Sequence, residues 1–446
     1  MTDSARRPAA APSAATPPTA GAIPDGARLP RLFPADDTRT LPAHRARYGP
    51  LPNRGSGLID DVEQAGLRGR GGAGFPTAVK LAAVAGRRRR SVVVANGTEG
   101  EPASTKDQTL LTLAPHLVLD GATLAAEAVG ARTIIVAIER SRVDTLAVVT
   151  EAIAERRAAG IERVEVRLEA APDRYVAGEE SALVHWLNGG EAKPLFVPPR
   201  PFERGVGGRP TLVDNVETLA HLGLIGRYGA SWFRSLGTAA DPGSTLLTVS
   251  GAVARPGVYE VAGGSSLAAV LDGAGAVAGR VPAVLIGGYF GTWVPGAAIG
   301  EITIGAESLR RAGSSLGCGV VFALPEDACG LHESARVARW LAGENAGQCG
   351  PCVYGLDALA GVMEAMVVGG PALGSMSSGS RTAAERVQQL TDEIAGRGAC
   401  KHPDGAVRFV QSSLAVFAAE VARHAEHGPC GAAVGHLPTP TPGAWR

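Results

Sequence analysis

The chain has 446 residues, which is enough for about three domains of ordinary size. Lys and Arg (43) balance Asp and Glu (43), so no net charge draws the chain to nucleic acid or to an anionic membrane. The 45% of apolar residues exclude a largely disordered chain. No run approaches about 18 uninterrupted apolar residues, so the sequence predicts no membrane-spanning helix.

Residues 1–45 begin with a tract rich in Ala, Pro, Thr and Ser, and we expect them to form a disordered tail. Arg6 and Arg7 could open a twin-arginine export signal, but the prolines that follow leave no apolar segment behind them. We therefore expect a cytoplasmic protein that is at most peripheral to a membrane complex. In that compartment thiols stay reduced, so clustered cysteines favour a metal over a disulfide.

Residues 46–238 alternate short apolar runs with helical patterns, which is typical of an α/β layer architecture. The predicted strands are 91–95, 133–139 and 164–170, and the predicted helices are 116–129, 142–159, 178–187 and 215–228.

Residues 239–315 read as a small α+β module, with strands at 245–253, 258–261 and 283–287 and a helix at 266–272. Residues 316–430 are predicted to end in a bundle of four helices, at 334–344, 351–366, 381–395 and 406–424. Residues 431–446 are rich in Pro, Thr and Gly, and we expect a loose tail.

The strongest local signal is the stretch from Gly66 to Lys80, GLRGRGGAGFPTAVK. Five glycines among residues 66–74 fit neither a helix nor a strand, and they let backbone N–H groups approach a phosphate or a flat ring. Arg70 and Lys80 add positive charge, and a helix beginning near Thr77 would favour an anion at its N-terminus. The alternative is a flexible surface loop.

Two further motifs follow predicted strands, where open α/β sheets place their ligands. In NGTEGEP, Asn96 offers a donor and an acceptor, and Glu99 and Glu101 can hold ribityl or ribose hydroxyls. The alternative is a solvated acidic turn. In RYVAGEES, the residues that could contact a sugar or nicotinamide are Tyr175, Gly178, Glu179 and Glu180. The alternative is that these acids only complement a helix dipole.

Cysteine spacing gives the last motif, Cys349-Gly-Pro-Cys352 with Cys400 further along the chain. A CxxC pair is typical of a redox or metal site. Zinc needs four ligands, and a [4Fe–4S] cluster normally takes four thiolates, but Ala346 stands where a cysteine would complete a C-x2-C-x2-C run. The other cysteines are predicted to lie outside this site, as plain buried thiols at Cys318 and Cys329 and as a tail residue at Cys430.

Taken together, the four motifs resemble the NADH-binding flavoprotein subunit of respiratory complex I and the matching subunits of NAD-linked hydrogenases and formate dehydrogenases. The resemblance runs from about residue 66 to about residue 425. It implies an α/β fold made of a Rossmann-like FMN-binding domain at 46–238, a ubiquitin-like β-grasp (SLBB-type) module at 239–315, and a C-terminal four-helix bundle with an iron–sulfur site at 316–430.

The resemblance also implies an NADH dehydrogenase activity, in which hydride passes from NADH to FMN and single electrons leave through a [4Fe–4S] cluster. The implied nucleotide is NADH or NADPH. The implied electron acceptor is a ferredoxin-like protein, another oxidoreductase subunit or a quinone-linked acceptor. Nucleic acid is not among the implied partners. No side chain need act as acid or base. The implied flavin positions are Gly69, Gly71, Gly72, Gly74, Lys80, Asn96, Glu99, Tyr175, Gly178 and Asn215; the nicotinamide positions are Phe75, Glu101 and Glu180; the cluster ligands are Cys349, Cys352 and Cys400.

Several positions depart from the family pattern. Thr98 replaces an acid near the flavin, and Ala83 replaces an aromatic residue after the lysine. A family phenylalanine has two matches, Phe196 and Phe202, and Arg200 nearby could hold the extra phosphate of NADPH. These departures leave open an alternative: a non-catalytic flavin- or cluster-carrying electron relay, or a ligand-binding paralogue that has lost NADH binding.

The cluster site departs as well, because Ala346 occupies the position of the first family thiolate. Water or the nearby His402 could supply a fourth ligand, and a neutral imidazole would raise the reduction potential relative to a thiolate. The alternative is a degenerate, empty site.

Overall fold

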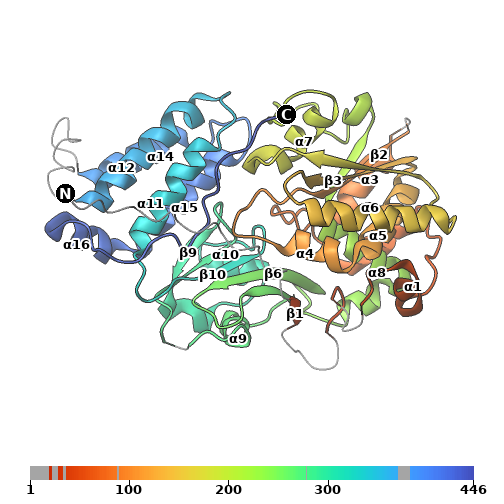
Figure 1. Ribbon diagram of the computed structural model, residues 1–446, viewed down its shortest axis with the longest axis horizontal. Coiled ribbons are helices and arrows are strands. Elements are labelled where there is room, and N and C mark those ends of the chain that lie inside the picture. The colour runs from red at the N-terminus through yellow and green to blue at the C-terminus, as the bar shows by residue number, and fades with distance from the viewer. Residues whose placement is uncertain (1–19, 23–28, 34–36, 88–89, 278, 370–381) are drawn as a thin grey trace, which may run out of the picture.

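The computed structural model describes residues 20–22, 29–33, 37–87, 90–277, 279–369 and 382–446. Figure 1 shows three parts: an α/β part on the right, a β-sheet part below, and a helical part on the left. This order of parts agrees with the predicted fold class.

The α/β part contains a parallel four-stranded sheet in the order β4-β3-β2-β5. Its strands are β2 (Val92–Gly97), β3 (Thr133–Glu139), β4 (Glu165–Ala171) and β5 (Thr211–Asn215). All residues of β3 are buried, which explains why this strand reads as a continuous apolar run. The three predicted strands of this part are confirmed to within two residues at each end.

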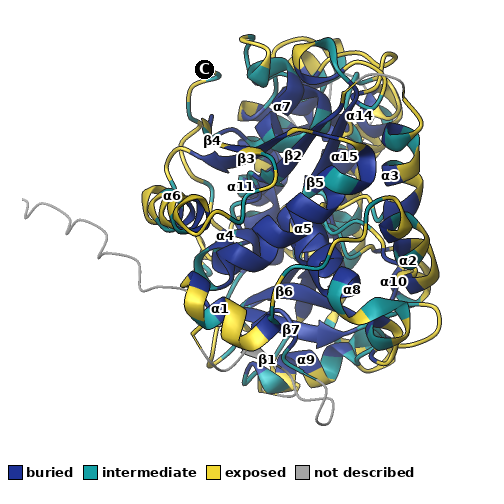
Figure 2. Ribbon diagram, turned by 90° about the vertical axis from the view of Figure 1, so that its right-hand side faces the viewer, coloured by how far each residue is buried: buried dark blue, intermediate teal, exposed yellow. Residues whose placement is uncertain are grey.

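Helices cover both faces of this sheet. They are α2 (Gly57–Ala65), α3 (Thr77–Ala85), α4 (Lys106–Leu113), α5 (Pro115–Val129), α6 (Val143–Ala158), α7 (Glu180–Leu187) and α8 (Val216–Arg234), with a 3-10 turn η1 (Tyr175–Gly178). Figure 2 shows α5 buried along its length, whereas α6 exposes one side. A Cβ atom at Gly121 of α5 would lie 1.7 Å from the carbonyl oxygen of Leu219, so only glycine permits α5 and α8 to approach this closely.

The predicted disordered tail, residues 1–45, differs from the structure wherever the structure describes it. Leu32 is fully buried, and helix α1 (Leu41–Tyr48) begins inside the predicted tail. His44 of α1 lies 2.7 Å from the buried carboxylate of Asp120. These residues are ordered because they pack on partners distant in the sequence.

The second part is a six-stranded sheet in the order β1-β7-β6-β10-β8-β9. Its elements are β1 (Ala20–Ala22), β6 (Ser244–Gly251), β7 (Gly257–Ala262), α9 (Leu267–Gly273), β8 (Ala283–Ile286), β9 (Thr292–Pro295), a 3-10 turn η3 (Gly296–Glu301), α10 (Ala306–Arg311) and β10 (Val320–Ala323). Strand β10 pairs with β6 in parallel and with β8 in antiparallel fashion. It lies beyond residue 315, so the predicted boundary of this module ends too early.

The third part is helical. It contains α11 (Gly330–Gly343), a π-helical turn η4 (Pro351–Leu356), α12 (Asp357–Val368), α14 (Ala383–Ile394), α15 (His402–Val416) and α16 (Ala418–His427). The predicted single helix at 406–424 is wrong, because α15 and α16 meet at Phe417 with a bend of 74°.

The C-terminal tail is also ordered, contrary to the predicted loose tail at 431–446. The Leu437 side chain is fully buried, and the Trp340 indole donates a hydrogen bond of 2.6 Å to the carbonyl oxygen of Pro440. Near its end, the ring of Trp445 lies 4.0 Å from the guanidinium carbon of Arg174. The tail therefore connects the helical part to the α/β part.

Among the described residues, one continuous helical stretch, Pro351–Val368, is long and apolar enough to cross a membrane. Two bent helix pairs would also qualify if each pair were taken as one span. Half of the 351–368 stretch is buried inside the protein, and Asp357 and Glu364 within it form ion pairs with Arg339. We therefore interpret this stretch as a core helix of the bundle.

Candidate functional site

The glycine-rich loop joins α2 to α3 and turns back on itself. The Gly69 N–H donates a hydrogen bond of 2.8 Å to the carbonyl oxygen of Phe75. Gly72 and Gly74 have φ angles of 110° and 61°, which other residues rarely adopt. A Cβ atom at Gly74 would meet nothing within 4 Å, so the backbone is open on this side. The loop thus offers an accessible main-chain surface, as a flavin or phosphate site requires.

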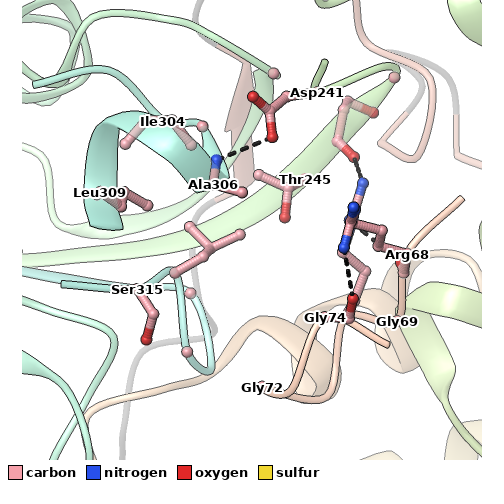
Figure 3. Close-up of a pocket in the computed structure, with 18 of the residues that line it drawn as sticks. Arg68, Gly69, Gly72, Gly74, Asp241, Thr245, Ile304, Ala306, Leu309 and Ser315 are labelled. Atoms are coloured by element: carbon pink, nitrogen blue, oxygen red, sulfur yellow. Dashed lines mark hydrogen bonds between the residues drawn. The ribbon is translucent and has the colours of Figure 1, made fainter. Parts of the chain in front are cut away.

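A cavity of about 330 Å³ lies between this loop and the six-stranded sheet. Figure 3 shows Gly69, Gly72 and Gly74 on one side of it and Leu309 and Ser315 on the other. Four of the predicted site residues line this cavity, namely Gly69, Arg70, Gly72 and Gly74. Gly71 and Phe75 lie in the same loop but outside the lining of the cavity. The other predicted cofactor positions lie around the ends of β2 and β5 and on α3, η1 and α7.

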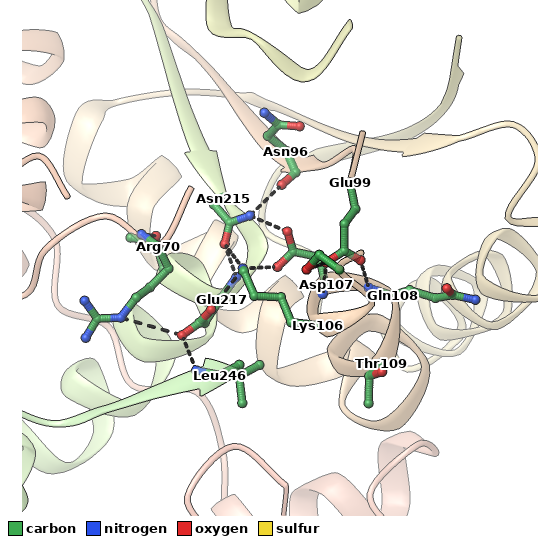
Figure 4. A network of polar contacts seen from close by, with 12 residues as sticks. Arg70, Asn96, Glu99, Lys106, Asp107, Gln108, Thr109, Asn215, Glu217 and Leu246 are labelled. Carbon is green, nitrogen blue, oxygen red and sulfur yellow. Dashed lines mark hydrogen bonds and ion pairs between the residues drawn. The ribbon is translucent and has the colours of Figure 1, made fainter. Parts of the chain in front are cut away.

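Arg70 of the loop is part of a buried network of polar side chains (Figure 4). Arg70 donates from its side chain to the carbonyl oxygen of Ser244 at 3.0 Å, and its Nε lies 3.6 Å from the Glu217 carboxylate. The Lys106 ammonium lies 2.6 Å from Asp107 and 3.0 Å from Glu217. Arg70 is therefore held by the protein itself, and its side chain positions the loop.

Sequence reasoning missed Lys106, Asp107 and Glu217, although Lys106 and Glu217 line the cavity. The predicted Asn215 belongs to the same network. Its side-chain amide donates a hydrogen bond of 2.6 Å to the Asp107 carboxylate. Its side-chain oxygen caps α8 by accepting a hydrogen bond of 3.0 Å from the backbone N–H of Glu217. Burial raises the pKa of Asp107 to about 7, against the opposing effect of Lys106.

Lys80 lies at the second turn of α3, just after the loop. Its Nζ is 2.9 Å from a Glu180 oxygen and 3.6 Å from an Asp214 oxygen. Burial alone would lower the pKa of Lys80, but these two carboxylates outweigh it and raise the pKa, so the lysine stays cationic. Burial raises the pKa of Asp214 to about 6, and its second oxygen is buried without a hydrogen-bond partner. A cation and an unsatisfied buried oxygen at the loop fit a polar cofactor.

The ends of β2 and of the turn η1 are packed against each other. The Asn96 amide donates a hydrogen bond of 2.9 Å to the carbonyl oxygen of Gly178. The Asn96 oxygen accepts from the N–H of Thr98 at 3.2 Å. A Cβ atom at Gly178 would lie 2.5 Å from the Thr98 hydroxyl oxygen. The two predicted motifs are therefore brought together, and glycine at 178 is required for their contact.

Two of the predicted acids cap helices. Glu99 accepts from the N–H groups of Asp107 and Gln108 at 3.2 and 3.1 Å, at the start of α4. Glu179 accepts from the N–H groups of Ser181 and Ala182 at 3.0 and 3.1 Å, at the start of α7. For Glu179 this geometry agrees with the helix-dipole alternative. These carboxylates already have partners within the protein.

Glu101 and Tyr175 join all three parts of the molecule. A Glu101 oxygen accepts from the Tyr289 N–H at 2.7 Å and from the Tyr175 hydroxyl at 3.2 Å. Burial raises the pKa of Glu101 to about 7. The Tyr175 ring packs edge-on against the His402 ring, with ring centres 5.8 Å apart. The backbone N–H of Tyr175 donates a hydrogen bond of 2.8 Å to the Glu344 carboxylate. One side chain thus touches both the predicted nucleotide region and the predicted cluster region.

The predicted aromatic positions separate by exposure. Phe75 and Phe196 are 52% and 76% exposed, so both rings face open space. Phe202 instead packs against the α/β core, with its ring 5.2 Å from the Arg87 guanidinium carbon. Of the two candidate matches, Phe196 is the one available to a ligand.

Cys349, Cys352, Cys400 and His402 line one small cavity, together with Ala346. Cys352 lies in the π-helical turn η4 and Cys349 two residues before it; such a distortion is often found at functional sites. His402 Nε2 lies 2.9 Å from the carbonyl oxygen of Leu341, which fixes the proton on that nitrogen. Burial lowers the pKa of His402 to about 4, and its Nδ1 is buried without a hydrogen-bond partner. Three thiols and a free imidazole nitrogen fit an iron–sulfur cluster.

Three family models match the chain. The Nuo51 FMN-binding domain matches residues 62–231, the SLBB domain matches residues 246–283, and the NADH-ubiquinone oxidoreductase-F iron-sulfur binding region matches residues 333–424. Their order along the chain is that of the predicted fold class.

Similar proteins agree with these models. The second NADH-quinone oxidoreductase F subunit of Rhizobium meliloti is 32% identical over 425 residues, which cover 92% of this chain and 97% of that protein. The NADH-quinone oxidoreductase F subunit of Mycobacterium bovis is 32% identical over 395 residues, with 84% and 85% covered. The crystal structure of an NAD+-reducing [NiFe]-hydrogenase in the H2-reduced state aligns with a TM-score of 0.72 at 31% identity, covering 82% of this chain. This chain spans 62% of that hydrogenase chain.

Proposed function

Because the chain belongs to the family of the NADH-quinone oxidoreductase F subunits, we propose that it is the component through which electrons from NADH enter an oxidoreductase. It oxidises NADH at an FMN held in the α/β part and delivers single electrons through a [4Fe–4S] cluster in the helical part. The acceptor is a quinone-linked or ferredoxin-like partner. We place the protein in the cytoplasm, peripheral to a membrane complex.

One observation carries this proposal: Tyr175 contacts Glu101 with its hydroxyl and His402 with its ring. Glu101 lies in the loop after β2, beside the predicted nicotinamide region, and His402 lines the cavity of the three cysteines. A route for electrons from nucleotide to cluster requires these two regions to be neighbours. The contacts of Tyr175 with Glu101 and His402 support this arrangement.

FMN, when bound, can accept two electrons as a hydride and release them one at a time. The residues proposed to hold it are the open loop at Gly69 to Gly74 and the Lys80 ammonium. The Lys80 ammonium stays cationic between Glu180 and Asp214 and also donates to the carbonyl oxygen of Val213. What it can offer a cofactor is therefore a further charge-assisted hydrogen bond rather than uncompensated charge. Phe75 and Phe196 are exposed and are proposed to contact the nicotinamide nucleotide. Position and charge, rather than an acid or a base, are what the protein contributes.

We propose His402 Nδ1 as the fourth ligand of the cluster, beside Cys349, Cys352 and Cys400. The Leu341 carbonyl holds the Nε2 proton, which leaves the Nδ1 lone pair free. Ala346 cannot coordinate a metal, and it lines the same cavity. His402→Cys should then retain the cluster at a lower reduction potential, whereas His402→Ala should lose iron. Iron analysis and potentiometry on anaerobic protein distinguish the two, and an unchanged potential in His402→Cys would reject His402 as a ligand.

Anaerobic titration tests the function. The purified protein should show a flavin absorption band that NADH bleaches, with FMN and about four iron and four sulfide ions per chain. A parallel titration with NADPH decides the nucleotide. If bound flavin stays oxidised with both nucleotides, the chain is instead the non-catalytic relay that the changes at Thr98, Ala83 and Ala346 would suggest.

A further inference from the structure

Two cysteines and a histidine that do not line the cavity of Cys349 come together in the helical part. Cys329 precedes α11 as its N-cap residue, His424 lies in α16, and Cys430 follows that helix. The Sγ atoms of both cysteines and a ring nitrogen of His424 all lie within 4.8 Å of one another. We call these three residues the C-terminal cysteine site.

The distance between the cysteine sulfur and the histidine nitrogen in this site matches tetrahedral zinc. Bonds of about 2.3 Å to sulfur and about 2.0–2.1 Å to nitrogen place the two ligand atoms about 3.5 Å apart at a tetrahedral angle. The observed separation between Cys329 Sγ and His424 Nε2 is 3.6 Å. The atoms are therefore already at the distance that a shared zinc ion would set.

The surroundings of the site orient these ligands. His424 is fully buried, and its Nδ1 lies 2.7 Å from the carbonyl oxygen of Val367. This contact places the ring proton on Nδ1 and turns the Nε2 lone pair toward Cys329, which is how metal-binding histidines are usually held. A Glu420 oxygen lies 3.1 Å from Cys329 Sγ and is available as a further ligand.

We propose that Cys329, His424 and Cys430 bind a zinc ion, with Glu420 or a water molecule in the fourth position. Two thiolates and an imidazole are a typical zinc donor set, and binding releases the two thiol protons. The site is separate from the proposed iron–sulfur site, which takes its own three cysteines.

The ion would fasten the C-terminal tail to the bundle. A β-bridge between Ala328 and Ala433 already aligns the tail with the residue before Cys329. Beyond that bridge, the tail runs past Trp340 to Trp445, which stacks on Arg174 next to Tyr175. Zinc at Cys430 would therefore hold the segment that covers the junction between the α/β and helical parts.

The test is metal analysis of the full-length protein, purified anaerobically from zinc-supplemented medium. We expect about one zinc ion per chain in the wild type, and less than a tenth of that in Cys430→Ser and in His424→Gln. Iron and FMN contents should stay at the wild-type level in both variants, which shows that they fold. Cys318→Ser is the matched control, because Cys318 is a partly buried cysteine outside both sites. The Cys318→Ser protein should therefore contain as much zinc as the wild type.

Cobalt gives a second readout, because Co2+ replacing zinc between two thiolates produces intense thiolate charge-transfer and tetrahedral d–d bands. These bands should be present in the wild type and in Cys318→Ser and absent in Cys430→Ser. Three results would overturn the proposal: no zinc in the wild type after equilibration with excess Zn2+ under reducing conditions, zinc retained by both ligand variants, or a disulfide between Cys329 and Cys430 in anaerobic protein.

Discussion

Replacing Lys80 with methionine removes a cation that the structure places directly after the glycine loop, while keeping most of the volume of the side chain. Its ammonium is 2.9 Å from Glu180 and 3.6 Å from Asp214. In Lys80→Met both carboxylates lose their counter-charge, and the proposed FMN site loses a positive group. We expect weaker FMN binding and a smaller loss of folding stability.

The size of the binding effect follows from one charge-assisted hydrogen bond, about 1.5–3 kcal/mol. At about 1.4 kcal/mol per factor of ten, this weakens FMN binding by about 10- to 150-fold. The free energy of unfolding should fall by only about 1–3 kcal/mol, less than for a fully buried pair. The reasons are that Lys80 and Glu180 are 27% and 32% exposed, and that Asp214, whose pKa is about 6, can take up a proton.

The assay is titration of FMN into flavin-free protein, followed by quenching of FMN fluorescence, with urea unfolding measured in parallel. Lys193→Met is the matched control: its side chain is 21% exposed, and its ammonium lies 2.9 Å from Glu191. If Lys80→Met binds FMN within twofold of the wild type, Lys80 does not face the cofactor. If both variants lose FMN equally, the effect is a general loss of stability and the assignment also fails.

Three further outcomes are expected. Burial raises the pKa of Glu101 to about 7, so the folded state keeps a proton that the unfolded chain releases near pH 4.5, and the free energy of unfolding should fall as pH rises between these values. In urea unfolding, Glu101→Gln should lack this one-proton dependence of the free energy of unfolding on pH. The same pH dependence in the variant and the wild type would contradict the raised pKa. Asp120→Asn removes the carboxylate that Arg227 and Arg156 share, which leaves Arg156 with Glu162 alone, and should cost about 3–5 kcal/mol in the same assay. A cost below about 1 kcal/mol would show that the pairs with Asp120 contribute little. Gly178→Ala places a Cβ atom 2.5 Å from the Thr98 hydroxyl oxygen and should lower the ratio of bound FMN to protein. Gly57→Ala is the control, because a Cβ atom there meets nothing within 4 Å, and it should keep the wild-type ratio. A wild-type ratio in Gly178→Ala would mean that the two loops adjust to the added methyl group.

The strands of the α/β part could be predicted because burial on both faces forces an unbroken apolar run, as in β3. The N-terminal segment could not, because its order depends on distant partners. Arg31 stacks on Trp232 at 4.0 Å, and the N–H of Leu32 donates to Glu260 at 2.9 Å. No local pattern reveals a buried arginine, so a polar, proline-rich segment is mistaken for a disordered one.

The break between α15 and α16 was missed for a related reason. The apolar pattern continues through Phe417, which is buried, and no glycine or proline marks the bend. Likewise, the sequence placed Glu99 and Glu179 in a binding site by motif alone. The structure shows each of them capping a helix, which a motif cannot distinguish from contact with a ligand.

The two groups of cysteines show where spacing stops being informative. Cys349 and Cys352 are three positions apart, so the sequence displays their pairing directly. Cys329 and His424 are 95 positions apart, and only the packing of α16 against the start of α11 brings them together. A cysteine that looks solitary in the sequence can therefore still belong to a metal site. The burial of His424 and its fixed ring orientation, rather than any motif, argue that this contact has been built for an ion.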